Sequence, residues 1–218
     1  YSALGTLAWR RGDKPAARAA HQQALALYQQ LGQVDYIASS TTNLAILAAT
    51  AGEHAEAEAQ FRDALRHYQQ SGDRYNEATT WKNLGHLLVE QGRLAEAEEA
   101  LQQALAIRSR LELPLPLAHT LSVLADVAMA RGHWDQALAY QQRVLETARD
   151  HDDRLLRAQA HADLAAAHRR LGQLTEARAQ AAQALVLADE LDHPASRAFA
   201  WYQQGQVALA SGHHALAM

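Results

Sequence analysis

The chain has 218 residues, a formal net charge of −4 and no cysteine. With 20 basic and 24 acidic residues it has no cationic excess to displace counterions from a nucleic-acid backbone, so we expect no direct nucleic-acid partner. The lack of cysteine excludes disulfides and thiolate metal sites, and no apolar run is long enough to span a membrane, so we expect a soluble, cytoplasmic protein.

A 40-residue period runs through the whole chain. Glycine marks each period, at Gly12, Gly52, Gly92, Gly132, Gly172 and Gly212. Five residues later comes an alanine, at Ala17, Ala57, Ala97, Ala137, Ala177 and Ala217. Such a period is typical of a solenoid, in which each unit buries its apolar face only when its neighbours stack on it. We therefore predict one array over residues 1–218, with repeats at about 1–34, 35–74, 75–114, 115–154, 155–194 and a partial 195–218.

Each period predicts two helices, because Ala, Leu, Gln, Glu and Arg dominate and apolar residues recur three and four apart. In the second repeat we expect helices from about Tyr36 to Thr50 and from about Ala55 to Gln70. The anchor glycine suits the left-handed residue that ends a helix. Pro15 is expected in the first turn of a helix, where its missing N–H does no harm. A second break closes each repeat, at residues 31–32, 71–73, 113–114, 151–153 and 192–194.

One junction differs from the others. Residues 113–117 are Leu-Pro-Leu-Pro-Leu, and we expect the two prolines to bar helix and fix an extended connection before the fourth helix pair. This segment is either a stiff turn whose leucines pack between repeats or a hinge that forms a protruding contact.

Small residues flank every anchor. A leucine and then Gly or Ala lie eight and seven residues before it, except in the last repeat, which has Gln204 and Gly205. Together with the alanine five residues after the anchor, these positions let the two helix backbones approach closely.

These residues resemble the tetratricopeptide repeat, whose helix pair carries W-x2-L-G-x2-Y, a glycine turn and then spaced Ala, aromatic and Ala. The third repeat matches best, with Trp81, Leu84, Gly85, Gly92, Ala97, Ala104 and Leu105, and the second supplies the aromatic as Phe61. The period is 40 rather than the family's usual 34, and the family's tyrosine is replaced by Ala8, Ala48, Leu88, Ala128, His168 and Ala208. Such 40-residue variants look like those of large bacterial signalling ATPases, transcription regulators and kinesin light chains. The resemblance implies an all-α, right-handed superhelical solenoid of antiparallel helix pairs, with about five and a half repeats.

The resemblance also implies that the first helix of each pair lines a concave groove, with outward positions 13, 10, 6 and 3 residues before the glycine. We expect this groove to bind a peptide or protein segment, although an ordinary solvated face is the alternative. The candidate ligand-binding residues are Asn43, Thr79, Lys82, Asn83, His86, His119, Asp126, Gln159, Arg169 and Tyr202.

Several candidates have two interpretations. Asn43 and Asn83 occupy equivalent places and suit either pairing with a peptide backbone or a bond to their own neighbouring loops. Lys82, with His86 and Asn43, resembles part of a clamp for a terminal carboxylate, or Lys82 is simply solvated. Arg169, followed by another arginine, suits either an acidic partner or the negative end of its own helix.

No nucleotide-binding, metal-hydrolase or serine-hydrolase motif is present, so we predict no catalytic residue and no cofactor. Twelve histidines suggest a metal, but His161 and His168 with Asp163 do not form a set of three ligands at a spacing known to converge. The acidic residues at 150–153 are better explained as a helix start capped by Asp. We therefore predict no metal site.

The expected function is recognition by a scaffold that is the sensor or assembly region of a larger multidomain bacterial signalling or regulatory protein. The chain begins at Tyr1 without an initiator methionine, which favours such a segment. An intramolecular regulator of a neighbouring ATPase or DNA-binding domain is an alternative, and a small-molecule effector domain is another. Trp9, Phe199, Tyr202 and Leu209 gather near the chain ends, so self-association through exposed terminal repeats is also expected.

Overall fold

The structure, a computed structural model, describes residues 1–212, and their regular secondary structure consists of eleven α-helices. Ala217, the alanine of the sixth anchor, lies outside these residues. The helices are α1 (Ser2–Arg10), α2 (Lys14–Gln30), α3 (Val34–Thr50), α4 (His54–Ser71), α5 (Arg74–Glu90), α6 (Leu94–Arg110), α7 (Pro114–Ala130), α8 (Trp134–Asp150), α9 (Arg154–Arg170), α10 (Leu174–Glu190) and α11 (Pro194–Ala210).

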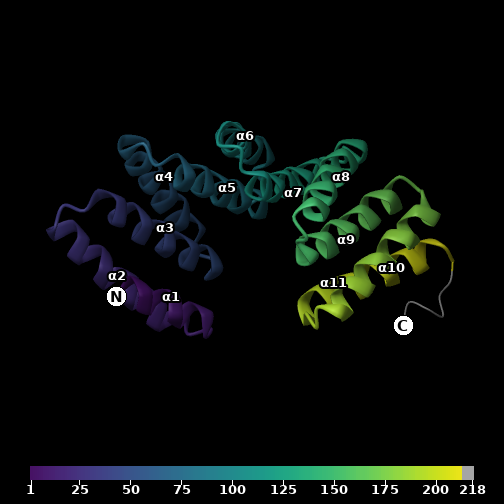
Figure 1. Cartoon of the computed structure of the whole chain (residues 1–218), viewed down its shortest axis with the longest axis horizontal. Coiled ribbons are helices and arrows are strands. Elements are labelled where there is room, and N and C mark those ends of the chain that lie inside the picture. The colour runs from purple at the N-terminus through teal and green to yellow at the C-terminus, as the bar shows by residue number, and fades with distance from the viewer. Residues whose placement is uncertain (213–218) are drawn as a thin grey trace. The chain divides into compact units, whose positions relative to one another are not determined.

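The helices form successive antiparallel pairs, from α1 with α2 to α9 with α10, and α11 is the first helix of a sixth repeat (Figure 1). This confirms the predicted all-α array of about five and a half repeats. Most helices have 17 residues, and short connections such as residues 51–53 complete the period. The chain divides into two compact units, Tyr1–Leu111 with α1 to α6 and Glu112–Met218 with α7 to α11.

The turns between paired helices have the predicted left-handed anchor. Gly52 has a φ of +79°, and the amide of the next residue, Glu53, donates to the carbonyl of Ala48 at 2.9 Å. The other five anchors also have positive φ, between 72° and 77°. Because a left-handed residue redirects the chain within one position, the second helix can fold back on the first after only three residues.

The prediction for residues 113–117 is wrong. Pro114 begins α7 and Pro116 lies in its first turn, so the segment is helical rather than extended. The first N–H groups of a helix have no acceptor within it, and proline therefore costs little at these positions. The helix closes normally behind the prolines, since the amide of Leu117 donates to the carbonyl of Leu113 at 2.9 Å.

The small residues lie where the two helices of a pair meet. The anchor alanines from Ala17 to Ala177 are all fully buried. In the third repeat, a Cβ added to Gly85 would lie 2.6 Å from Cγ of Leu101 and 3.4 Å from the carbonyl oxygen of Ala97. The close approach predicted from the repeat signature is therefore present between α5 and α6.

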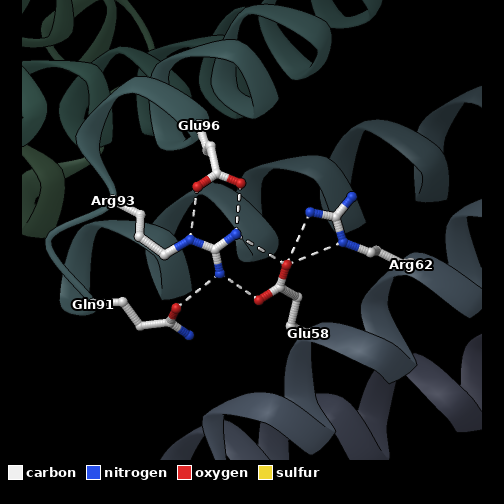
Figure 2. Close-up of polar contacts among 5 residues, drawn as sticks. All are labelled: Glu58, Arg62, Gln91, Arg93 and Glu96. Atoms are coloured by element: carbon white, nitrogen blue, oxygen red, sulfur yellow. Dashed lines mark hydrogen bonds and ion pairs between the residues drawn. The ribbon is translucent and has the colours of Figure 1, made fainter.

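Consecutive repeats of the first unit are also joined by ion pairs. Glu58 on α4 accepts hydrogen bonds from Arg62 on the same helix and from Arg93, which precedes α6 (Figure 2). Arg93 also bonds Glu96 and the side chain of Gln91. These contacts connect the second helices of two repeats through their polar faces.

Aspartates begin several helices. The side chain of Asp153 accepts a hydrogen bond from the amide of Leu156 at 2.9 Å, and Asp13 and Asp73 cap α2 and α5 in the same way. This confirms that the aspartate nearest α9 in the acidic segment at 150–153 caps a helix.

Candidate functional site

Three predicted site residues line one cavity in the first unit, which we call the first-unit cavity. Its volume is about 220 Å³. Lys82 and Asn83 are adjacent on α5, His86 lies about one helical turn further along it, and Phe61 of α4 is fully buried beside them. The lining residues are Ile46, Ala49, Thr50, Phe61, Lys82, Asn83, His86, Leu87 and Glu90. An apolar base with a few polar side chains is the usual composition of a binding cavity.

The electrostatics near this cavity are cationic. Burial lowers the pKa of Lys82, and the positive charge of Arg108 on α6 lowers it further. Arg108 is itself buried, which lowers its pKa, and its Nη2 donates to Oγ1 of Thr79 at 3.4 Å. Two like charges held partly away from water favour an anionic or carbonyl-rich ligand, because such a ligand relieves their repulsion. Sequence analysis missed Arg108, since it lies on a second helix.

The two predicted asparagines are free to bind a ligand. Asn43 and Asn83 are half-buried, and within residues 1–212 neither side chain forms a hydrogen bond. Neither asparagine is therefore bonded to its own neighbouring loop, which was the alternative interpretation. His86 lies 3.6 Å from the carboxylate of Glu90, measured from Nδ1 to Oε1, so its ring has an acidic neighbour on the same helix.

Asn43 lines a second, smaller cavity of about 80 Å³ in the same unit, with Thr6, Trp9 and Ile46. The imidazole of His21 on α2 also lines it. This ring is buried, its Nδ1 has no hydrogen-bond partner among the described residues, and burial lowers its pKa, so it is neutral near pH 7.

A recurring relationship connects these cavities. The residue nine positions after an anchor glycine lies beside the residue nine positions before the next anchor. His21 and Asn43 line one cavity, Phe61 and Asn83 line the other, and in the second unit Gln141 donates to Asp163. At this buried position of the second helix, other repeats have Phe61 or Leu101. The polar side chains of His21 and Gln141 at the same position were therefore a signal in the sequence, which sequence analysis missed.

Asp126 belongs to an acidic cluster in the second unit. Nε2 of Gln141 on α8 donates to Oδ2 of Asp163 on α9 at 3.0 Å. Burial raises the pKa of Asp163 to about 8, and the negative charge of Asp126 on α7 contributes to this shift. Burial also raises the pKa of Asp126, to about 6, although its side chain is exposed to solvent. The two carboxyl groups therefore lie close enough to repel one another.

The remaining predicted residues are dispersed. His119 and Gln159 are exposed on α7 and α9. Burial lowers the pKa of Arg169, Arg170 lowers it further, and Tyr202 on α11 acts in the opposite direction. Tyr202 is 57% exposed.

The outward positions are not uniform along the repeats. Thr42 and Ala162, ten residues before their glycines, are buried. Thr42 lies against the next first helix, with its Oγ1 3.5 Å from Oγ1 of Thr80 on α5. Small side chains at this position are covered by the neighbouring repeat, whereas Lys82 is long enough to reach the cavity.

No group of three or more His, Asp or Glu side chains within residues 1–212 is placed to hold a metal ion. Over the same residues, none of the helices is both long and apolar enough to cross a lipid bilayer.

A further cavity of about 400 Å³ lies between α4, α5 and α6, beside Trp81 and Leu84, and none of the predicted site residues lines it.

Comparison with known protein families agrees with this helix-pair architecture. Profiles described as tetratricopeptide repeat match residues 1–31, 36–110 and 116–190. The chain belongs to the tetratricopeptide repeat family. Its repeats thus form a generic protein-binding scaffold, as in the tetratricopeptide regions of larger proteins. No match is found among curated proteins.

Solved structures show the same tetratricopeptide fold. BtubC (BKLC) from P. vanneervenii has a TM-score of 0.79 at 22% identity, over 92% of this chain and 85% of that one. The STAND protein PH0952 from Pyrococcus horikoshii, with a tetratricopeptide repeat sensor, has a TM-score of 0.78 at 15% identity, over 97% and 33% of the two chains. A Rap protein complexed with Competence and Sporulation Factor has a TM-score of 0.68 at 17% identity, over 96% and 63%. At these identities the likeness concerns the fold.

Proposed function

We propose that this tetratricopeptide repeat chain binds a peptide or an extended segment of another protein along its first helices. The observation that carries this proposal is the first-unit cavity, where Lys82, Asn83 and His86 surround an apolar base. A carboxamide donates and accepts at once, so the unbonded side chains of Asn43 and Asn83 can pair with a peptide backbone whatever its side chains. Lys82 adds a donor for carbonyl or carboxylate oxygens. The structurally similar Rap protein in its complex with Competence and Sporulation Factor supports binding by this fold.

Each unit carries further predicted site residues. Thr79 lies beside Arg108 in the first unit, and His119, Asp126, Gln159, Arg169 and Tyr202 belong to first helices of the second unit. We assign them to ligand contact and assign no residue to catalysis, metal binding or cofactor binding. We also propose that the chain acts in the cytoplasm and binds neither nucleic acid nor membranes.

We infer that this region is the sensor or assembly part of a larger signalling or regulatory protein. The STAND protein PH0952, of which the matched region is 33%, supports this because its tetratricopeptide repeats are described as a sensor. The same observation favours a second candidate, an intramolecular regulator that restrains a neighbouring ATPase or DNA-binding domain. The parent sequence distinguishes the two: an ATPase motif or helix-turn-helix beyond this segment supports regulation, and neither motif supports a free adaptor.

Peptide selection tests the proposed function. Peptides are selected from a random 12-residue display library on the immobilised chain, and their affinities are then measured by calorimetry for variants Lys82→Ala, His86→Ala and His119→Ala. Each substitution is expected to weaken the binding of peptides that contact it, and thermal unfolding should stay nearly unchanged because all three side chains reach solvent.

Gln102→Ala is the matched control, because Gln102 is exposed on the second helix α6 and lines none of the cavities described above. Selected peptides that bind all three variants as tightly as the control would place the binding surface elsewhere and overturn the proposal.

Exposed aromatic residues at the last described helix bear on self-association. Trp201 and Tyr202 are 56% and 57% exposed on α11, and Phe199 is 39% exposed. Leu4 of α1, which corresponds to buried leucines of later repeats, is likewise 59% exposed. We propose that these surfaces associate at high concentration, which sedimentation velocity over a concentration series will detect.

A further inference from the structure

The acidic cluster of the second unit, which consists of Asp126, Asp163 and Gln141, has more hydrogen-bond acceptors than donors. Asp163 takes one hydrogen bond, from Nε2 of Gln141 at 3.0 Å. Asp126 forms no hydrogen bond or ion pair within residues 1–212. Three helices of this unit, α7, α8 and α9, each contribute one member, so the cluster belongs to one compact body.

Gln141 provides an independent observation at this site. Its side chain is 1% exposed, and its Oε1 has no hydrogen-bond partner among the described residues. Oε1 shares a carbon with the Nε2 that donates to Asp163, so this unpaired acceptor lies directly beside the carboxylates. A buried acceptor without a donor raises the free energy of the folded chain. A ligand that supplies the donor removes this cost.

We propose that this cluster binds the positively charged side chain of an arginine or lysine in the segment that the second unit recognises. This inference rests on the proposed function and deepens it, because it names the side chain that one part of the surface selects. A guanidinium carries five N–H donors and an ammonium three, and neither carries an acceptor. These donors complement two carboxylates and the carbonyl oxygen of Gln141.

The charges around the cluster agree with this ligand. The negative charge of Asp126 contributes to the raised pKa of Asp163, and burial raises the pKa of Asp126. Arg169, further along α9, is subject to Arg170 and Tyr202 rather than to either aspartate. A bound cation would neutralise the repulsion between the carboxyl groups, so the ionised forms become favoured when the ligand is present.

Proton linkage gives this site a definite pH dependence. In the free chain the carboxyl groups titrate at about 6 and about 8, and a cation binds the ionised forms. Binding therefore releases protons across this range, and affinity rises as the pH increases from about 6 to about 8. An ordinary exposed aspartate, already ionised at pH 6, would show no such rise.

A matched pair of probes tests the proposal on the full chain. The probes are the blocked peptides acetyl-Ala-Ala-Arg-Ala-Ala-amide and the same peptide with citrulline, which has the shape of arginine but no charge. Binding is followed by NMR, through the side-chain amide of Gln141 and the backbone amides of α7 and α9. The arginine peptide is expected to shift the Gln141 amide and to bind about five- to tenfold more tightly than the citrulline peptide, because a charge-assisted bond is lost in the latter.

Variants separate the cluster from general charge effects. Asp126→Asn and Asp163→Asn should each abolish the preference for arginine and remove most of the pH dependence. Glu146→Gln, an equal loss of charge at an exposed position on α8, should keep both. Asp126 is exposed, so its variant is expected to fold even if Asp163→Asn does not.

Two results would overturn this inference: equal affinity of the wild-type chain for both probes, or an arginine preference that survives in Asp126→Asn. Neither result would affect the proposed function, which is tested separately by selected peptides and by the substitutions at Lys82, His86 and His119. Conversely, a failure of those substitutions alongside a positive arginine result would keep this site and reject the wider surface.

Discussion

Arg93 meets Glu58 across two consecutive repeats, with Nη1 and Oε2 2.5 Å apart, at the position where Glu53 meets Arg18 one repeat earlier. The two pairs are equivalent in the repeat, but their charges are exchanged. In one pair the second helix supplies the cation, and in the next it supplies the anion. Opposite polarity at consecutive interfaces helps each helix pair to select its own neighbour, since a shift by one repeat would bring like charges together.

A charge exchange tests this relationship. Glu58→Arg and Arg93→Glu should each lower the free energy of unfolding, because each places like charges in contact. The double variant should recover part of the loss, with a small favourable coupling energy, since both side chains are partly exposed. Urea unfolding of all four proteins measures this energy. The bonds of Arg62 and Glu96 to this pair make recovery incomplete, and strictly additive losses would contradict a direct coupling.

Two glycines at the same repeat position should respond oppositely to alanine. At Gly85 the new methyl group would lie 2.6 Å from the fully buried Leu101, so overpacking of about 1–3 kcal/mol should outweigh the gain in helix propensity. At Gly205 no atom of residues 1–212 lies within 4 Å of the added Cβ, so Gly205→Ala should stabilise by about 0.5–1 kcal/mol. Denaturant midpoints will show the difference, and a stabilising Gly85→Ala would mean that α5 and α6 are less tightly packed than described.

Non-glycine residues with positive φ offer another matched pair. Glu112 (φ 52°) and Asp192 (φ 46°) occupy the place where earlier junctions have Gly32 and Gly72. Glu112→Gly should stabilise by about 0.5–1 kcal/mol, because a left-handed glutamate is strained and this outweighs the added freedom of the unfolded chain. Asp192→Gly should gain less, since it also loses the bond from Nη2 of Arg197, 2.9 Å from Asp192. Thermal unfolding compares the two, and a greater gain at 192 would contradict this account.

The acidic cluster should also affect stability as the pH changes. The pKa of Asp163 is raised in the folded chain from 3.8 to about 8, so the folded state binds more protons than the unfolded state between these values. The free energy of unfolding should therefore fall as the pH rises through this window. Asp163→Asn removes this titration, so it should stabilise the chain relative to wild type by about 1 kcal/mol or more near pH 8 and have less effect near pH 4.

The comparison for this prediction is the difference between variant and wild type as a function of pH, because groups that do not interact with Asp163 titrate equally in both proteins. A difference that is constant from pH 4 to pH 8 would contradict the prediction, because it would show that the pKa of Asp163 is the same in the folded and unfolded states.

Part of the candidate site was predictable from the repeat. Lys82, Asn83 and His86 were chosen because equivalent first-helix positions fall on one face, and they do line one cavity. Arg108 and Gln141 were missed because both lie on second helices, whose inner side chains reach the first helix of the same or the next repeat. The period along the chain does not show which side chain is long enough to cross that interface.

The proline-rich junction shows how position within a helix changes the outcome. Two prolines at this junction predict a barrier to helix, yet Pro114 and Pro116 lie in the first turn of α7. Whether proline breaks or starts a helix depends on whether its missing N–H would have had an acceptor, and that is decided by where the preceding helix ends.

The sequence by itself determined the helix pairs, the boundaries of the second pair to within about two residues, the left-handed anchors and the buried alanines, but not the start of α7. These properties depend on local conformational preference and on spacings that recur every 40 residues. Only the tertiary structure decided which polar side chains are withdrawn from water and which charges face one another, as at Gln141, Asp163 and Asp126. Burial and electrostatic repulsion depend on distances between helices that are far apart along the chain, and a repeat pattern does not contain those distances.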